Sequence, residues 1–173
     1  MPHLALVGTN GSGKSTLLRI IAGQLAASEG RVRCAYAHQP LPLAQLYRHL
    51  SWSGPYLDPY FELTLREHLD LHFRFRECLL PDPYELIDLL DLRAHRDKPL
   101  RRYSSGMLQR VKVGTALFTR SALLLLDEPT SNMDQANADR ILGLIAEHTR
   151  QRLFVLASNL AREYEAFQAV IRL

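Results

Sequence analysis

The stretch Gly8-Thr-Asn-Gly-Ser-Gly-Lys-Ser-Thr16 follows the pattern G-x-x-x-x-G-K-[ST]. A short apolar segment, residues 3–7, precedes it, and residues 14–25 carry apolar side chains at helical spacing. A strand, a glycine-rich turn and a helix in this order are the context in which the pattern forms a phosphate-binding loop. The alternative, a glycine turn with an exposed lysine, does not account for this context. We therefore predict that the stretch, called the P-loop below, binds nucleotide phosphates.

The residue types of the P-loop suit this chemistry. Gly8, Gly11 and Gly13 allow a tight turn in which backbone N–H groups face anionic oxygens, and the following helix adds its positive N-terminal end. Lys14 supplies a mobile charge for the β- and γ-phosphates, and the Ser15 hydroxyl can bind Mg2+. We predict that ATP contacts Gly8, Thr9, Asn10, Gly11, Ser12, Gly13, Lys14, Ser15 and Thr16.

Two acidic residues follow a continuously apolar run, Leu123-Leu-Leu-Leu-Asp-Glu. In open α/β sheets, ligands bind at the carboxyl ends of the strands, which is where these side chains are expected. Asp127 is suited to Mg2+, directly or through water, and Glu128 to orienting or deprotonating the attacking water. An acidic turn closed by Pro129 would be a serious alternative without the P-loop. Together with the P-loop, the pair indicates nucleotide hydrolysis.

Predicted strands and helices alternate at both ends of the sequence. Apolar runs at residues 122–126 and 152–157 are typical of strands buried on both faces, and residues 134–150 between them have a helical pattern. This alternation predicts an α/β fold of the P-loop NTPase type, with a mostly parallel sheet flanked by helices, in a single domain of residues 1–173. Residues 64–102, where helices follow one another without a strand, are predicted to form a helical subdomain within it.

Capping and turn residues predict the shorter elements. Thr64 and Glu67 have the spacing of a capping box, Pro83 suits the first position of a helix, and Ser104 or Ser105 can cap another. Residues 39–47 between two of the strands are expected to be irregular. The remaining predicted elements are strands at 31–35, 49–53 and 169–173 and helices at 65–73, 83–90 and 105–120.

The composition indicates a folded protein without extreme charge. Of 173 residues, 47% are hydrophobic and 23% charged, and the formal net charge is +3, which does not require a nucleic-acid partner. Cys34 and Cys78 are too few for a disulfide framework, the apolar runs are too short for a membrane span, and no leader segment opens the chain. We expect a cytoplasmic protein that reaches the membrane only through a partner.

From about Leu4 to the C-terminus, the sequence resembles the nucleotide-binding domain of ATP-binding cassette (ABC) proteins. The P-loop resembles the Walker A motif of that family, and the apolar run ending in Asp127 and Glu128 resembles its Walker B strand and catalytic glutamate. Ser131-Asn-Met-Asp134 corresponds to the D-loop. Between the two Walker motifs, as in the family, a segment resembles the signature motif L-S-G-G-Q and is followed by Leu-Gln-Arg; its residues are Tyr103, Ser104, Ser105, Gly106 and Met107.

The resemblance implies a head-to-tail dimer in which ATP lies between the P-loop of one subunit and the signature motif of the other. Ser104, Ser105 and Gly106 are predicted to begin a helix, so N–H groups, hydroxyls and the helix dipole converge on an anion. A plain helix cap would explain Ser104 but not the whole segment. The dimer is either homomeric or heteromeric, and in a heteromer the partner can complement degenerate motifs.

The sequence departs from the family pattern in three places. The family has an antiparallel β region before the Walker A strand, with an aromatic residue that stacks on adenine; Met1 begins almost at that strand, which suggests a short form lacking the region. The Q-loop glutamine is not matched in Ser53-Gly-Pro-Tyr56, and Gln39 is interpreted as unrelated to it. Asn159 replaces the switch histidine; its amide can donate to the γ-phosphate without a positive charge, so slow hydrolysis is expected.

Two other clusters have ordinary explanations. His68 and His72 have metal-chelating spacing on a helix, but no third ligand is evident, so helix-surface histidines are favoured. Apolar residues at both ends of the same helix are expected to pack in the core. In the family, a helix of the membrane permease docks in this region, so an exposed apolar groove would indicate docking instead.

The resemblance favours the ATP-hydrolysing motor subunit of an ABC transporter, working with separate transmembrane permease subunits from the cytoplasmic face of the membrane. A second hypothesis is a nucleotide-gated regulatory module with little turnover, for which Asn159 and the unmatched glutamine argue. A third is an ABC ATPase acting on ribosomes or DNA, which would call for a basic stripe that the sequence lacks. The transported substrate and the direction of transport are not encoded in any of these motifs.

Overall fold

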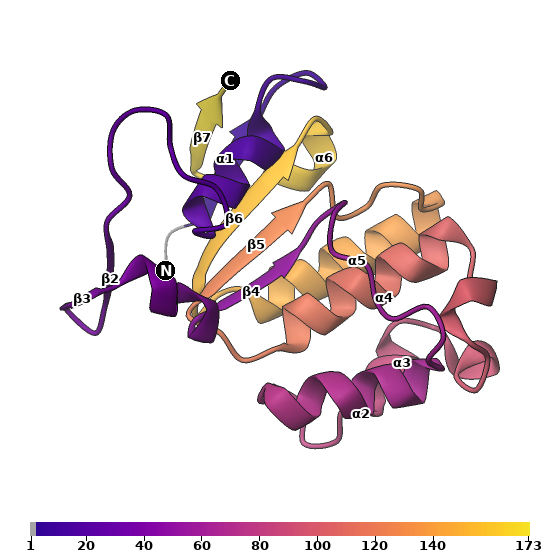
Figure 1. Cartoon of the computed structure of the whole chain (residues 1–173). Helices are drawn as coiled ribbons and strands as arrows, with labels where there is room; N and C mark the ends of the chain where they lie inside the picture. The colour runs from indigo at the N-terminus through magenta and orange to yellow at the C-terminus, as the bar shows by residue number, and fades with distance from the viewer. Residues whose placement is uncertain (1–2) are drawn as a thin grey trace.

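The computed structural model describes residues 3–173 and contains a five-stranded sheet in the order β4-β5-β6-β1-β7 (Figure 1). All neighbouring strands of this sheet are parallel. The predicted α/β architecture, with a mostly parallel sheet flanked by helices, is confirmed. The strands are β1 (His3–Val7), β4 (Leu50–Ser53), β5 (Leu123–Asp127), β6 (Leu153–Ser158) and β7 (Ala169–Arg172).

Helices cover both faces of the sheet (Figure 1). Every residue of β5 is buried, and its side chains alternate between two apolar cores, as expected for a strand. Leu125 packs in one core with Leu18 of α1 (Lys14–Ile21). Leu124 and Leu126 pack in the other core with residues of the helices α4 (Ser105–Phe118) and α5 (Gln135–His148). The P-loop and the acidic pair therefore extend from a strand layer that is fixed from both sides.

Helices and helical turns occupy the stretch between β4 and α4, namely α2 (Leu65–Phe75), α3 (Glu85–Leu89), η2 (Arg93–His95) and η3 (Leu100–Arg102). The capping box of α2 is confirmed, since the Glu67 carboxylate accepts from the Thr64 N–H at 2.8 Å and the Glu67 N–H donates to the Thr64 hydroxyl. The predicted start of this helix at Pro83 is wrong by two residues, because α3 begins at Glu85. The N–H groups of Glu85 and Leu86 donate to the carbonyl oxygens of Asp82 and Pro83, three residues earlier, at 3.1 and 3.2 Å, so Pro83 lies in a tighter turn that precedes the α-helix. The boundaries of the subdomain stay a prediction.

The segment between α1 and β4 forms a hairpin that was predicted only in part. β2 (Cys34–Tyr36) pairs antiparallel with β3 (Gln39–Leu41). The strand predicted at residues 31–35 therefore begins only at Cys34. The stretch 39–47, which was expected to be irregular, begins with β3. The two turn residues, Ala37 and His38, have φ values of 49° and 64°. Hairpin turns of this kind usually contain Asn-Gly or Asp-Gly, so Ala-His gave no turn signal. Gln39 lies in this hairpin, and η1 (Leu43–Arg48) then leads to β4.

The helices α1, α4 and α5 end earlier than predicted, and β7 is more exposed than the other strands of the sheet. α1 ends at Ile21 rather than at residue 25, because Gly23 adopts a left-handed conformation with φ 73°. α4 ends at Phe118 and α5 at His148. All four residues of β7 are exposed, since this strand lies at the edge of the sheet. Within residues 3–173, the structure has no helix with the length and apolar character that a membrane span requires.

Candidate nucleotide-binding site

The P-loop connects the carboxyl end of β1 to α1 and uses glycine where other residues would be strained. Gly11 and Gly13 have φ values of 85° and 100°, a region that L side chains rarely adopt. A Cβ at Gly8 would lie 2.5 Å from the Ser12 hydroxyl oxygen and 2.8 Å from the Leu173 carbonyl oxygen. Gly13 is also the N-cap of α1, and among the described residues no side chain forms a capping hydrogen bond to this helix. The N–H groups of its first turn are therefore available to an anion.

Lys14 is 5% exposed and folds back over the P-loop. Its ammonium group donates to the carbonyl oxygens of Gly8, at 2.9 Å, and Thr9, at 3.0 Å. Among residues 3–173, no carboxylate lies within ion-pair distance of this ammonium group. The positive charge is therefore held in the loop by neutral acceptors, which suits a group that binds phosphate oxygens.

Asp127, 2% exposed, ends β5 beside the P-loop. Burial raises the pKa of its carboxyl group, and the charge of Glu128 acts in the same direction, whereas a hydrogen bond with the Ser15 hydroxyl and the charge of Lys14 lower it. The Oδ2 atom has no hydrogen-bond partner within the described structure. A buried carboxylate oxygen without a partner, next to a serine hydroxyl, fits the oxygen ligands that Mg2+ requires.

Glu128 directly follows β5 in a conformation that is uncommon for its residue type. Its φ is 47°, in the left-handed region. The Glu128 N–H donates to the carbonyl oxygen of Ala157 in β6 at 2.9 Å, and its own carbonyl oxygen accepts from the Ser131 N–H at 3.1 Å. These bonds place the residue at the carboxyl edge of the sheet, where the P-loop also lies.

Asn159 directly follows β6, which pairs with β1 through Ser158 and Val7. Its amide nitrogen donates to the side-chain oxygen of Asn10 in the P-loop at 2.9 Å. The fold therefore brings a residue near the C-terminus into contact with the loop near the N-terminus. The contact places a neutral amide donor beside the loop, and its donation to a γ-phosphate stays a prediction.

The signature-like segment, residues 103–107, lies at the start of α4 and not at the ends of β1, β5 and β6. The Ser104 hydroxyl caps α4 by accepting from the Met107 N–H at 3.2 Å, so Ser104 rather than Ser105 is the cap. A Cβ at Gly106 would lie 2.6 Å from the Asn132 carbonyl oxygen, which packs this segment against residues 131–134. The hydroxyl of Tyr103 donates to the His95 carbonyl oxygen at 2.8 Å, and burial raises its pKa to about 12.

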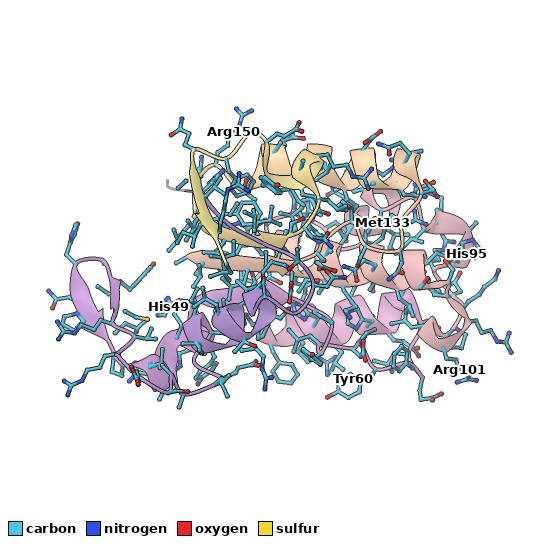
Figure 2. The ribbon with its side chains drawn as sticks, turned by 90° about the horizontal axis from the view of Figure 1, so that it is seen from above. His49, Tyr60, His95, Arg101, Met133 and Arg150 are labelled. Carbon is cyan, nitrogen blue, oxygen red and sulfur yellow. The ribbon has the colours of Figure 1, made fainter. Side chains whose placement is uncertain are left out.

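Figure 2 shows Met133 and His95 toward one end of the molecule, and His49 toward the opposite end. In Figure 1, the N-terminal end of α4 lies on the other face of the sheet from α1. One chain therefore keeps the signature-like segment away from its own P-loop, with the sheet between their helices.

The sequence matches a known protein family. A family described as "ABC transporter" matches residues 2–131. The chain belongs to this family. The cytochrome c biogenesis ATP-binding export protein CcmA from Brucella abortus (strain 2308) is 33% identical over 155 residues, which cover 90% of this chain and 71% of that protein. CcmA from Escherichia coli (strain K12) is 32% identical over 148 residues, which cover 84% of this chain and 70% of that protein.

Solved ABC structures have the same fold. A putative ABC transporter ATP-binding protein from Pyrococcus furiosus aligns with a TM-score of 0.81 and 19% identity, and the alignment covers 99% of this chain and 84% of that protein. An ATP-binding subunit of an ABC transporter aligns with a TM-score of 0.81 and 25% identity, over 99% of this chain and 74% of that one. The predicted resemblance to ABC nucleotide-binding subunits is confirmed.

Ser53-Gly-Pro-Tyr56, the segment predicted to stand at the Q-loop position, begins at the last residue of β4. Ser53 ends β4 beside Leu126, and the Tyr56 ring lies 5.6 Å from the guanidinium carbon of Arg19 on α1. This cation–π contact joins the segment to the P-loop helix. Tyr56 is 72% exposed, so it remains open to a ligand or a partner.

The two histidines of α2 face α4 and are half-buried rather than on the helix surface, which corrects the prediction. A ring nitrogen of His72 lies 2.8 Å from the Thr119 hydroxyl oxygen, and one of His68 lies 3.4 Å from that of Thr115. Burial lowers both pKa values, that of His72 to about 4, so the rings are neutral near pH 7. Across residues 3–173, no group of three or more His, Cys, Asp or Glu side chains is placed to hold a metal ion together.

Sequence reasoning missed two residues that contact the loop after β5. The Gln109 side-chain amide donates to the Glu128 carbonyl oxygen at 3.1 Å, and the Glu163 carboxylate accepts from the Thr130 N–H at 2.9 Å. Both side chains are buried. Gln109 was visible only as part of the Leu-Gln-Arg that follows the signature-like segment, and Glu163 carried no sequence signal, because both contacts depend on the tertiary fold.

Proposed function

We propose that this chain is the ATP-binding and ATP-hydrolysing subunit of an ABC transporter. The observation that carries the proposal is the meeting of two groups at the carboxyl edge of the sheet. Within residues 3–173, Lys14 is a buried cation that donates to two neutral carbonyl oxygens, and Asp127 is a buried carboxylate beside Ser15 whose Oδ2 atom has no hydrogen-bond partner. A triphosphate with a divalent cation would satisfy both.

In this proposal, each P-loop residue has a defined role. The free N–H groups at the start of α1 and the ammonium group of Lys14 bind phosphate oxygens. The Ser15 hydroxyl and the Asp127 carboxylate hold Mg2+, directly or through water. When bound, the ion supplies charge neutralisation at the phosphates. The remaining residues of the loop, from Gly8 to Thr16, shape the backbone around the phosphates.

Glu128 and Asn159 are the candidates for the hydrolytic step. The Glu128 carboxylate orients the attacking water and accepts its proton. Asn159 already contacts Asn10 and is placed to donate to a phosphate oxygen. Because a neutral amide stabilises developing negative charge less than a cation does, we expect slow hydrolysis.

A second chain would complete the site. Because α4 begins on the other face of the sheet from α1, the Ser104–Gly106 segment of one chain can contact ATP only on a neighbouring P-loop. We propose a head-to-tail dimer, homomeric or heteromeric, with ATP between the subunits. The relatives named CcmA are described as ATP-binding export proteins of cytochrome c biogenesis, which supports a transport role. We propose that this role is carried out with membrane permease subunits at the cytoplasmic face.

The decisive experiment measures phosphate release by the purified chain with ATP and Mg2+. We expect Glu128→Gln to reduce turnover by about a hundredfold or more while leaving ATP affinity within about twofold, because it removes the proton acceptor and keeps the size of the side chain. A matched control is Glu147→Gln on the exposed face of α5. Equal turnover of the wild type and Glu128→Gln would contradict hydrolysis at this site.

The second candidate is a nucleotide-gated regulatory module. The hydrogen bond between Asn159 and Asn10 favours it, because a side chain engaged with the P-loop can report nucleotide binding without turnover. The same assay separates the two functions. ATP binding without phosphate release would support the regulatory module, whereas release that depends on Glu128 would support the ATPase.

A further inference from the structure

The short turn formed by Glu128, Pro129 and Thr130 carries the proposed water-activating carboxylate. The direction of a side chain follows from the backbone that bears it, and Glu128 has a left-handed backbone with φ 47°. A non-glycine residue keeps this conformation only where the surroundings impose it. Contacts from two other parts of the chain hold the turn.

The first contact comes from α4, the helix that begins at the signature-like segment. Gln109 is 9% exposed, and its amide nitrogen donates to the carbonyl oxygens of Glu128 at 3.1 Å and Pro129 at 3.4 Å. One amide group thus fixes two consecutive carbonyl groups, those of the Glu128–Pro129 and Pro129–Thr130 peptide bonds. A side chain without a donor would leave both carbonyl groups without this partner.

The second contact comes from α6 (Ala161–Tyr164), just after Asn159. Glu163 is 5% exposed, and its Oε1 atom accepts from the Thr130 N–H at 2.9 Å and from the Thr130 hydroxyl. The Arg162 guanidinium donates to the same hydroxyl at 3.4 Å. The turn is therefore held on its far side by a charged acceptor, which makes a stronger hydrogen bond than a neutral one.

We propose that Gln109 and Glu163 are positioning residues that hold the Glu128–Thr130 turn and so direct the Glu128 carboxylate toward the attacking water. This inference rests on the proposed hydrolytic function. Gln109 connects the turn to the helix of the signature-like segment, and Glu163 connects it to the segment that bears Asn159. Displacement of a reacting group by about 1 Å can cost about a hundredfold in rate, so loss of either contact slows the chemical step without weakening ATP binding.

The test for Gln109 uses two substitutions of similar size. Gln109→Leu removes the donor, and Gln109→Glu replaces it with a carboxylate that faces two carbonyl oxygens. Each is expected to lower kcat about tenfold or more, with KM and ATP affinity within about twofold. Gln151→Glu, on the exposed turn before β6, is the matched control and leaves kcat unchanged. A kcat within twofold of wild type in Gln109→Leu, or ATP affinity that falls in parallel with kcat, would overturn the role of Gln109.

The test for Glu163 is rescue by a conservative variant. Glu163→Gln keeps an acceptor oxygen for Thr130 and is expected to retain kcat within about threefold, whereas Glu163→Leu loses about tenfold or more. Equal kcat values for the two variants would overturn the role of Glu163.

Hydrogen exchange provides a readout that does not need turnover. In Gln109→Leu and Glu163→Leu, the amides of Glu128 and of residues 130–133 are expected to exchange at least about tenfold faster, while those of β5 remain protected. Unchanged exchange in residues 128–133 would refute the proposal even in a chain that releases no phosphate. Absence of phosphate release from the wild type, with faster exchange in the variants, would count against hydrolysis but not against the two contacts.

Discussion

The P-loop and the Glu128–Thr130 turn both leave the carboxyl edge of the same sheet, yet they are built in different ways. The P-loop reaches its shape through its own sequence, with glycine at the positive φ values of positions 11 and 13. The Glu128–Thr130 turn has no glycine and depends on the distant side chains of Gln109 and Glu163. The comparison teaches that a loop encoded locally is visible in a sequence, whereas one held by tertiary contacts is visible only in the fold.

The largest expected effect comes from replacing a glycine that the backbone conformation of the P-loop requires. Gly13→Ala forces an L side chain into a backbone with φ 100°. Strain of this kind costs about 2 kcal/mol. The free P-loop of the variant relieves the strain by leaving the binding conformation, and ATP binding must restore it, so ATP affinity is expected to fall about thirtyfold. Titration with ATP, followed by calorimetry, measures the change. Affinity within twofold of wild type would show that glycine is not needed at this position.

The difference between loops encoded locally and loops held by tertiary contacts also explains which features could be predicted from the sequence. The parallel sheet, the P-loop and the positions of Asp127, Glu128 and Asn159 at strand ends followed from local patterns and from the rule that these ends share one edge. The β2–β3 hairpin was not predicted in full, because its Ala37-His38 turn lacks the Asn-Gly or Asp-Gly that usually marks such turns. The later start of α3 reflects a turn of bonds three residues apart, from the Glu85 and Leu86 N–H groups to the Asp82 and Pro83 carbonyl oxygens.

An intermediate effect concerns a contact between elements, the packing of His72 against Thr119. Burial lowers the pKa of His72 to about 4, below its ordinary value of 6.5. Between these values the unfolded chain binds more protons than the folded chain, so the stability contribution is present above pH 6.5 and is lost as the pH falls toward 4. After allowance for partial exposure, we expect a loss of about 1–2 kcal/mol.

Urea unfolding of wild type and His72→Gln across this pH range tests the prediction. The variant keeps a side chain that can reach Thr119 but has no titrating ring. Its unfolding free energy is expected to fall less than that of wild type between pH 6.5 and 4. Identical pH profiles would assign the loss of stability to other groups.

The smallest expected effect sharpens the comparison at a glycine that the fold does not need. Gly143 lies exposed within α5, its φ is not positive, and a Cβ there would meet nothing within 4 Å. Gly143→Ala is therefore expected to raise the unfolding free energy by about 0.5–1 kcal/mol, without changing ATP affinity. Urea unfolding measures the gain, and a loss of stability would mean that the glycine has a structural role.

The central claim is that ATP with Mg2+ binds where Lys14, Ser15 and Asp127 meet. Calorimetric titration of the purified chain with ATP, with and without Mg2+, tests it most directly, with Lys14→Gln as the variant. The account predicts binding that Mg2+ strengthens and that Lys14→Gln largely removes. Wild-type affinity that is indifferent to Mg2+ and unchanged in Lys14→Gln would contradict it.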